Sequence, residues 1–295
     1  MLMTQIFTVL FPIFFIILAG YLYARIRPLD MAVANRLNME FFTPALLFYI
    51  LADQNFDLVS YWPLALAGIW IILGSGLVVL PLVWYLKLQI RTFIPPMMFT
   101  NTGNMGLPMA LFAFGEDGLK AAVILFIMAN LIHLTIGVSI VNPYIKWRNF
   151  LKTPMIIATL AGVLFSLFQW HLPALFAIPI KMLGDVAIPL MLFSLGVRLT
   201  DINLADWRIG LLGGILCPLS GLIALLLIWP WLTLTPLQLG VLISFSVLPP
   251  AVINFIFAEQ YCQEPQKVAS IVLMGNVLSL FSLPLALAFA LSQLH

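Results

Sequence analysis

Charged residues are scarce in this sequence. Asp, Glu, Lys and Arg make up 8% of its 295 residues, whereas 63% are hydrophobic and the mean hydropathy is +1.12. A soluble globular domain carries roughly 25% charged residues. A chain this apolar cannot bury its hydrophobic surface in one water-soluble core. The sequence therefore predicts an all-α membrane protein embedded in a lipid bilayer.

Cysteines and the signatures of enzymes are also few. The two cysteines, Cys217 and Cys262, lie far apart and neither has a CxxC spacing, so no metal or redox motif and no disulfide follows from them. The sequence contains no HExxH, no GxSxG, no nucleotide-binding loop and no His/Cys cluster. We therefore expect no catalytic residue, no metal, no cofactor, no ATP-driven transport and no nucleic-acid partner.

Apolar segments of membrane-spanning length follow one another along the chain. A helix that crosses a bilayer needs about 20 mostly apolar residues. Charges, prolines and polar clusters divide the sequence into about ten such helices. We place the ten spans at residues 5–23, 34–52, 62–86, 93–114, 119–141, 154–170, 182–197, 209–229, 237–258 and 268–291.

Lysine and arginine alternate along the loops between these spans. The odd-numbered loops contain Arg25, Arg27, Arg36, Lys87, Arg91, Lys146, Arg148, Lys152, Arg198, Arg208 and Lys267. The even-numbered loops contain Lys120 and Lys181. Because Lys and Arg concentrate in cytoplasmic loops, this asymmetry predicts a multi-pass protein with both termini outside the cytoplasm.

Short matches indicate an internal repeat. Thr43–Phe48 (TPALLF) resembles Ile188–Phe193 (IPLMLF), and Met128–Asn130 (MAN) resembles Met274–Asn276 (MGN). Each half then holds five spans, and an odd number forces the second half to enter the membrane from the opposite face. The sequence thus predicts a 5+5 inverted repeat, an architecture of many secondary transporters.

The two repeats are expected at residues 1–150 and 151–295. Their fourth spans, the fourth and ninth of the chain, both contain helix-breaking residues. Residues 100–110 read TNTGNMGLPMA, and residues 244–254 read SFSVLPPAVIN. Glycine adds backbone freedom, and proline lacks the N–H that helix bonding needs. Freed backbone groups at membrane depth are tolerated where they line a cavity, so we expect two broken helices that frame a transport site near the midplane.

The candidate substrate-binding residues come from these two stretches. They are Asn101, Thr102, Asn104, Gly106, Pro108, Ser246, Pro249, Pro250 and Asn254. Half-helix N-termini favour anions, and asparagine amides can both donate and accept hydrogen bonds. Two alternatives stay open: the asparagines cap the broken helices internally, and the hydroxyls bond to local backbone.

Other polar residues lie in neighbouring spans. Asn130 and Asn276 hold equivalent repeat positions and are expected to brace the crossing of the broken helices. His133 lies one turn from Asn130 and could relay a proton, although a hydrogen-bonded packing role is the alternative. Glu40 and Asp185, paired by the repeat register, are the candidate coupling residues, with interfacial salt bridges as the alternative.

These motifs resemble the auxin efflux carrier family, which includes plant auxin carriers and bacterial permeases. The resemblance covers essentially the whole chain. It is carried by Asn101-Thr102-x-x-Met105-Gly106-Leu107-Pro108, Pro189-Leu190-Met191-Leu192-x-x-Leu195-Gly196, and Leu248-Pro249 with Phe257-Ala258 and Tyr261. It implies a fold like sodium–proton antiporters and bile-acid transporters. Spans one, two, six and seven would form a scaffold. Spans three to five and eight to ten would form a moving transport domain, with four and nine crossing at their breaks.

The resemblance also implies roles for single residues. Asn101 matches an asparagine that meets the substrate carboxylate in plant carriers, and Pro108 matches a proline at the crossing. Asn254 stands where plant carriers have the second crossing proline, which favours a more polar site in this chain.

The expected function is secondary transport of a small organic anion, such as malate, malonate or an auxin-like acid, by alternating access. The resemblance to bacterial members implies a plasma (inner) membrane location and a homodimer. Two alternatives stay open. One is a sodium- or proton-coupled (Na+ or H+) symporter of another solute. The other is an intramembrane receptor or enzyme that binds a ligand without moving it.

Overall fold

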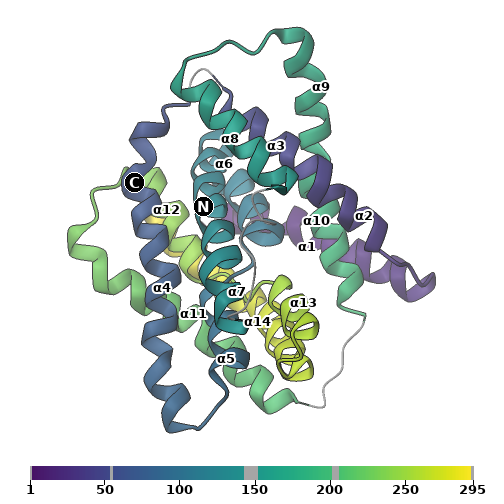
Figure 1. The fold of residues 1–295 in the computed structure, drawn as a ribbon, viewed down its shortest axis with the longest axis vertical. Helices are drawn as coiled ribbons and strands as arrows, with labels where there is room; N and C mark the ends of the chain where they lie inside the picture. Colours follow the sequence, from purple (N-terminus) through teal and green to yellow (C-terminus); the bar gives the residue numbers. More distant parts are fainter. Residues whose placement is uncertain (1, 54–55, 143–151, 201–205, 294–295) are drawn as a thin grey trace. The chain divides into compact units, whose positions relative to one another are not determined.

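The computed structural model describes residues 2–53, 56–142, 152–200 and 206–293 (Figure 1). Across these ranges the regular elements are helices, and the only β-type pairing is an isolated antiparallel bridge between Thr100 and Pro250. The predicted all-α class is therefore confirmed.

The helices before residue 142 include three π-helical turns and one 3-10 turn. They are α1 (Leu2–Ile26), α2 (Ala32–Leu37), η1 (Asn38–Phe42), α3 (Thr43–Leu51), η2 (Leu58–Tyr61), α4 (Trp62–Tyr85), α5 (Ile90–Met98), η3 (Thr102–Gly106), α6 (Leu107–Ile132), η4 (His133–Gly137) and α7 (Val138–Val141). The later helices are α8 (Pro154–Leu167), α9 (Ala174–Asp185), α10 (Ala187–Arg198), α11 (Trp207–Ile228), η6 (Trp229–Trp231), α12 (Pro236–Ser246), α13 (Ile253–Gln260) and α14 (Pro265–Ser292).

The chain divides into two compact units. The larger unit comprises Met1–Leu10, Pro63–Ile145 and Ile202–His295, and the smaller unit comprises Phe11–Trp62 and Lys146–Asp201. Each unit is thus assembled from both halves of the sequence.

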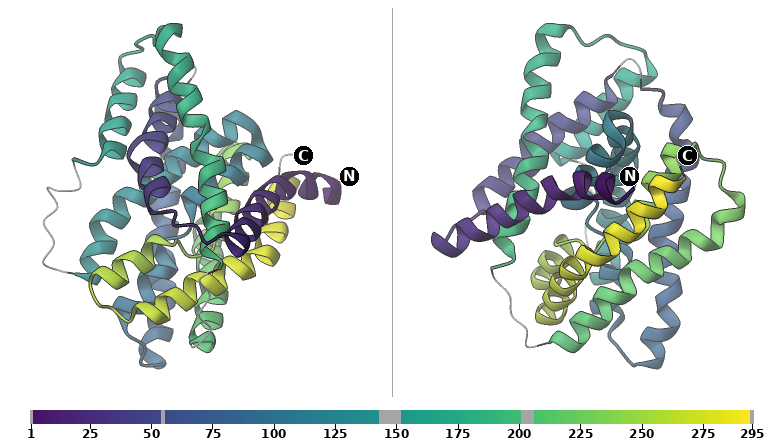
Figure 2. Two further views of the ribbon diagram at one scale, coloured as in Figure 1. Left: turned by 90° about the vertical axis from the view of Figure 1, so that its right-hand side faces the viewer. Right: turned by 180° about the vertical axis from the view of Figure 1, so that it is seen from behind.

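Within the larger unit, α14 packs along α11 (Figure 2), and α12 packs against both α14 and α6. The indole Nε1 of Trp70 on α4 donates to the carbonyl of Ala224 on α11, at 2.9 Å. A polar indole group inside an apolar bundle usually finds such a partner, and here it joins two long helices.

Within the smaller unit, α3 packs against α8 and α9. The rings of Phe48 and Phe165 meet edge to face with centroids 5.2 Å apart. A second contact centre joins α1, α2 and α10 through Ala24, Met31 and Val197. The side chains in these contacts are all apolar, as expected for helices that lie in a lipid bilayer.

Many large apolar side chains of the described residues are exposed, for example Phe15 at 59% and Leu175 at 78%. Six helical segments in the described part of the chain are long and apolar enough to cross a bilayer: Thr4–Ile26, Leu58–Tyr85, Thr102–Val141, Ala174–Arg198, Trp207–Trp231 and Pro265–Ser292. Two shorter apolar helices are α8 and α12. The chain is therefore a multi-pass membrane protein.

The segment Thr102–Val141 has 40 residues, about twice the length that one crossing needs. Gly115 interrupts it with φ +70°, a backbone conformation that glycine adopts readily because it has no Cβ. The sequence places the boundary between the fourth and fifth spans at this point, after residue 114.

One predicted boundary is wrong. The seventh span was expected to begin at Met182, just after Lys181, whereas helix begins at Ala174. Lys181 is accommodated inside the helix because its ammonium pairs with Asp185 one turn later, at 3.0 Å. A paired, partly exposed charge does not end a helix.

Candidate functional site

The first interruption lies between α5 and η3. Helix α5 ends at Met98, and helical winding resumes at Thr102. The interruption therefore falls at the start of the stretch 100–110, and the residues after Asn101 are already helical. The reason is local, because the carbonyl of Asn101 accepts from the N–H groups of Met105 at 3.2 Å and Gly106 at 3.1 Å, and so closes the first turn.

The second interruption lies between α12 and α13. Helix α12 ends at Ser246 and α13 begins at Ile253, which agrees with the break predicted from Pro249 and Pro250. Neither proline has an N–H to continue the helix. The hydroxyl of Ser246 is buried and donates to the carbonyl of Ile243 at 2.7 Å, so it serves the last turn of its own helix.

The two interruptions are paired through their backbones. The N–H of Asn101 donates to the carbonyl of Pro249 at 2.7 Å, and the N–H of Ala251 donates to the carbonyl of Phe99 at 2.9 Å. Thr100 and Pro250 form the antiparallel bridge between them. Buried backbone groups need partners, and each break here supplies partners to the other. Two segments about 150 residues apart in sequence thus meet within the larger unit.

Asn276 on α14 braces this pairing from the side. Its Oδ1 accepts from Nδ2 of Asn101 at 3.1 Å, and its Nδ2 donates to the carbonyls of Pro250 at 3.2 Å and Val272 at 2.7 Å. The side chain is buried. Asn276 thus hydrogen-bonds to both interrupted segments, through Asn101 and Pro250.

Asn254 hydrogen-bonds to both interrupted segments. Its Nδ2 donates to the carbonyl of Phe99 at 2.8 Å and to that of Ala251 at 2.9 Å. These bonds are the internal capping considered as the alternative role for this residue. Its Oδ1 is buried, and among the described residues it has no hydrogen-bond partner. One acceptor at the break is thus left unused.

Other polar groups near the breaks also stand without partners in the described part of the chain. The hydroxyl of Ser244 on α12 is buried and unpaired. The amide of Asn104 on η3 is half-buried, and no side-chain hydrogen bond to a described residue forms there. Thr102, Gly106 and Pro108 are buried in the same short helical stretch. Asn104 is therefore the candidate residue whose side chain is least committed to holding the fold.

His133 packs against both interrupted segments. Its ring stacks on Phe99 with centroids 3.9 Å apart and planes 4° apart, and it meets Phe257 of α13 edge to face at 5.3 Å. The side chain is buried in η4, a π-helical turn, and such turns are frequent at functional sites. Asn130, one turn earlier, donates to the carbonyl of Phe126 in its own helix at 2.7 Å. It differs in this from its repeat partner Asn276.

Two contributors to this site were not predicted from the sequence. Phe99 supplies the carbonyl that both Asn254 and Ala251 bind, and the ring on which His133 stacks. Gly275 lets α14 approach the second break, since an added Cβ would lie 2.4 Å from Cδ of Pro250. A glycine next to an asparagine within an apolar span was the signal that could have revealed it.

The candidate coupling residues lie in the smaller unit and not with this group. Glu40 Oε1 lies 3.0 Å from Nε of Arg36, and Asp185 Oδ2 lies 3.0 Å from Nζ of Lys181. All four side chains are largely exposed. Exposed pairs of this kind contribute about 0–1 kcal/mol to stability.

Comparison of the sequence with known proteins identifies a family. A sequence model of the family described as membrane transport protein matches residues 5–146 and 141–287. The chain belongs to the auxin efflux carrier family.

Relatives within the auxin efflux carrier family differ in how much of them the chain matches. A candidate malonate transporter of Rhizobium meliloti is 25% identical over 94% of this chain and 93% of its own length. An uncharacterized transporter of Methanocaldococcus jannaschii is 23% identical over 64% of each protein. Auxin efflux carrier component 1 of Arabidopsis thaliana is 27% identical over 45% of this chain and 23% of its own length. The chain thus spans less than a quarter of that plant carrier.

Proposed function

We propose that this protein is a secondary transporter of small organic anions, carboxylates such as malonate or malate or auxin-like acids, that works by alternating access. The observation that carries the proposal is the pairing of two interrupted helices through Asn101, Pro249, Phe99 and Ala251. Irregular backbone within apolar helices is costly and is retained where it builds a binding site. A protein that only needed to span the membrane would have no use for it.

Two helix N-termini at the breaks account for the choice of an anion. Helical winding starts at Thr102 on one side and at Ile253 on the other. The first N–H groups of a helix lack intrahelical acceptors, and the helix dipole adds partial positive charge there. An anion can be held by such ends without a lysine, and the half-buried amide of Asn104 offers a further donor. We propose that the substrate is bound by residues of these two stretches, namely Asn101, Thr102, Asn104, Gly106, Pro108, Ser246, Pro249, Pro250 and Asn254.

The division into two units supports the proposed transport mechanism. The smaller unit contains most of the first predicted span, from Phe11 onward, and the second, sixth and seventh spans, whereas the larger unit contains the start of the first span and nearly all of the others. This supports a scaffold and a moving transport domain, with the site carried entirely by the latter. A 5+5 inverted repeat of residues 1–150 and 151–295, ten spans, a homodimer, and an inner-membrane location with both termini outside the cytoplasm complete the proposal.

Malonate is the first substrate to test, because a candidate malonate transporter is similar over nearly the full length of both chains. The purified protein would be reconstituted in liposomes, and uptake of malonate, malate and an auxin-like acid would be measured with wild type and Asn101→Ala. We expect wild type to show saturable flux of one of these carboxylates and Asn101→Ala to show none. Flux of the variant equal to wild type would refute the site, and absence of saturable carboxylate flux in folded protein would refute the function.

Coupling to a cation is the second candidate. The unpaired oxygens of Asn254 and Ser244 favour it, because amide and hydroxyl oxygens are ligands that hard cations accept. The same liposomes with sodium replaced by choline, and with the pH varied, separate the modes. Flux that needs sodium or a proton gradient indicates a symporter, whereas flux unchanged in both tests indicates uncoupled transport.

A further inference from the structure

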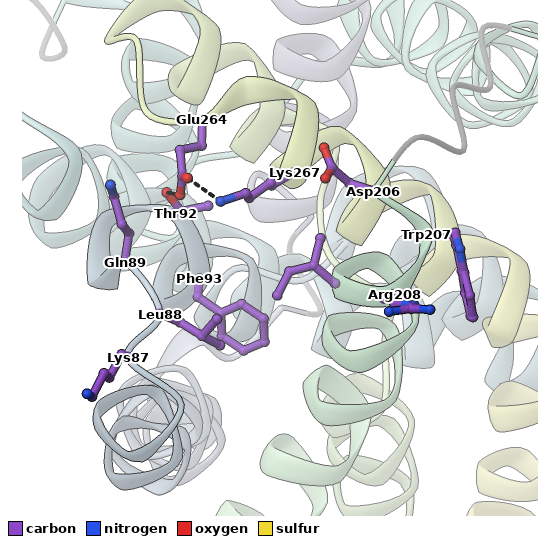
Figure 3. Close-up of a pocket in the computed structure, with 11 residues that line it drawn as sticks. Lys87, Leu88, Gln89, Thr92, Phe93, Asp206, Trp207, Arg208, Glu264 and Lys267 are labelled. Carbon is purple, nitrogen blue, oxygen red and sulfur yellow. Dashed lines mark hydrogen bonds and ion pairs between the residues drawn. The ribbon is translucent and has the colours of Figure 1, made fainter.

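A pocket of about 670 Å³ lies in the larger unit, and its lining includes no residue of the paired breaks (Figure 3). Its volume falls within the range of about 300–1,000 Å³ that is typical of ligand sites. Three stretches far apart in sequence form it: the α4–α5 connection, the start of α11 and the start of α14. The lining residues are Lys87, Leu88, Gln89, Thr92, Phe93, Asp206, Trp207, Arg208, Ile209, Glu264 and Lys267.

Three helix N-termini meet at this pocket, those of α5, α11 and α14. The residues that precede these helices, Gln89, Asp206 and Glu264, all line it. None of these three side chains accepts a capping hydrogen bond from a backbone N–H of the helix that it precedes. Each N-terminus carries roughly half a positive charge, and together they favour an anion in the cavity.

The side chains add further positive charge. Glu264 pairs with Lys267 and accepts from the hydroxyl of Thr92 at 2.8 Å. Partial burial raises the pKa of Glu264, but the hydrogen bonds from Lys267 and Thr92 and the positive charge of Lys267 outweigh this and lower the pKa overall. Glu264 therefore stays ionised and neutralises Lys267. Lys87 and Arg208 remain, opposed by Asp206.

The two remaining cations stand on opposite rims. Figure 3 shows Lys87 on one side and Arg208 on the other, with the apolar Leu88 and Phe93 between them. Both basic side chains are exposed, and the described residues offer neither of them an ion pair. The cavity thus combines an apolar floor with a basic rim.

The pocket also lies at the boundary of the apolar segments. The candidate span Trp207–Trp231 begins at a lining residue, and the spans Leu58–Tyr85 and Pro265–Ser292 end or begin within two residues of one. Trp207 is 48% exposed, and tryptophan is enriched where membrane meets water. Lys87 and Arg208 lie in odd-numbered loops of the sequence. The distribution of Lys and Arg assigns these loops to the cytoplasmic side.

We propose that this pocket binds a phosphate group, that of an anionic phospholipid headgroup whose acyl chains lie along the apolar floor. Basic pockets between membrane helices on the cytoplasmic side bind such headgroups. Lys87 and Arg208 contact the phosphate from two sides, and the three N-termini face its charge. A soluble phosphate ester offers the same chemistry without the acyl chains. The site is independent of the transport site and does not rest on the proposed function.

The test is ligand-induced thermal stabilisation of the full-length protein in detergent. The probes are phosphatidylglycerol, phosphatidylcholine, glycerol phosphate and malonate. The variants are Lys87→Gln, Arg208→Gln and, as a control of equal charge change, Arg91→Gln. Arg91 is exposed in the first turn of α5, four residues after Lys87, but does not line the pocket. Native mass spectrometry of retained lipid gives a second measurement on each variant.

Stabilisation by phosphatidylglycerol but not phosphatidylcholine is expected, with apparent affinity roughly tenfold weaker in Lys87→Gln and Arg208→Gln and unchanged in Arg91→Gln. Equal stabilisation by glycerol phosphate would support the site with a soluble ester as its ligand. An equal loss in Arg91→Gln would overturn the proposal in favour of diffuse surface charge. The proposal would also be overturned if no phosphate compound stabilised the protein. Stabilisation by malonate alone that depends on Lys87 and Arg208 would overturn it as well.

Discussion

Replacing Asn276 with alanine should destabilise the protein more than replacing Asn130 does. The two asparagines hold matching positions in the repeat motifs, and each donates to the carbonyl four residues earlier in its helix. Only Asn276 also binds the paired breaks, through Asn101 and the carbonyl of Pro250. Because the bond within the helix is lost in both variants, it cancels in the comparison.

The magnitude follows from the two groups that Asn276→Ala leaves buried without a partner. Each unsatisfied group costs about 1–3 kcal/mol in a protein interior, which gives about 2–6 kcal/mol. Hydrogen bonds between membrane helices average about 0.6 kcal/mol, which sets a lower bound of about 1 kcal/mol for two. The expected excess over Asn130→Ala therefore lies between about 1 and 6 kcal/mol. Even the lower bound changes the folding equilibrium constant about fivefold.

The assay is reversible unfolding of both variants in one detergent, followed by tryptophan fluorescence, with malonate flux measured in parallel. Asn276→Ala should unfold at lower denaturant concentration and should transport less than Asn130→Ala. Equal destabilisation of the two variants would refute the bracing role, because it would mean that only the bond within each helix matters.

Three further predictions concern single contacts. Gly275→Ala should lower both thermal stability and flux, because the added Cβ would lie 2.4 Å from Pro250; unchanged values would show that α14 is free to shift. Because the folded-state pKa of Glu264 is lowered, its stabilisation is complete above the unfolded value of about 4.3 and is lost as the pH falls through the lower folded value. Wild type should therefore lose its advantage in melting temperature over Glu264→Gln as the pH falls below about 4.3, and a constant difference down to pH 2 would contradict this. His133→Phe should retain flux, because phenylalanine keeps the stacked ring contacts; complete loss of flux in folded protein would indicate a proton relay instead.

The helix interruptions could be predicted because their causes are local. A proline pair lacks two N–H groups whatever surrounds it, so the break at Pro249 and Pro250 follows directly from the sequence. The extent of the first break could not be predicted, because it depends on the carbonyl of Asn101, a backbone group that is the same in every residue. The pattern indicates that a helix is weakened there, and the bonds from Met105 and Gly106 to Asn101 decide where it resumes.

The roles of the polar residues depended on tertiary neighbours. Asn130 and Asn276 are equivalent in the sequence, but only Asn276 lies beside the pairing. The contribution of Phe99 is a carbonyl and a ring face, and neither distinguishes it from other phenylalanines in apolar spans. The sequence identifies the loops that contain Lys87 and Arg208 as charged segments. It does not indicate that the two loops line one pocket.

The most direct test of the account is malonate counterflow in liposomes with Asn104→Ala and, as a matched control, Gln260→Ala. Asn104 has a half-buried amide with no side-chain hydrogen bond to a described residue, on the helical turn that follows the first break, whereas Gln260 has an exposed amide at the end of α13. If the paired breaks hold the transported anion, Asn104→Ala should remain folded and lose most of its counterflow, and Gln260→Ala should match wild type. Counterflow that is equal in all three proteins would contradict the central claim that these breaks form the transport site.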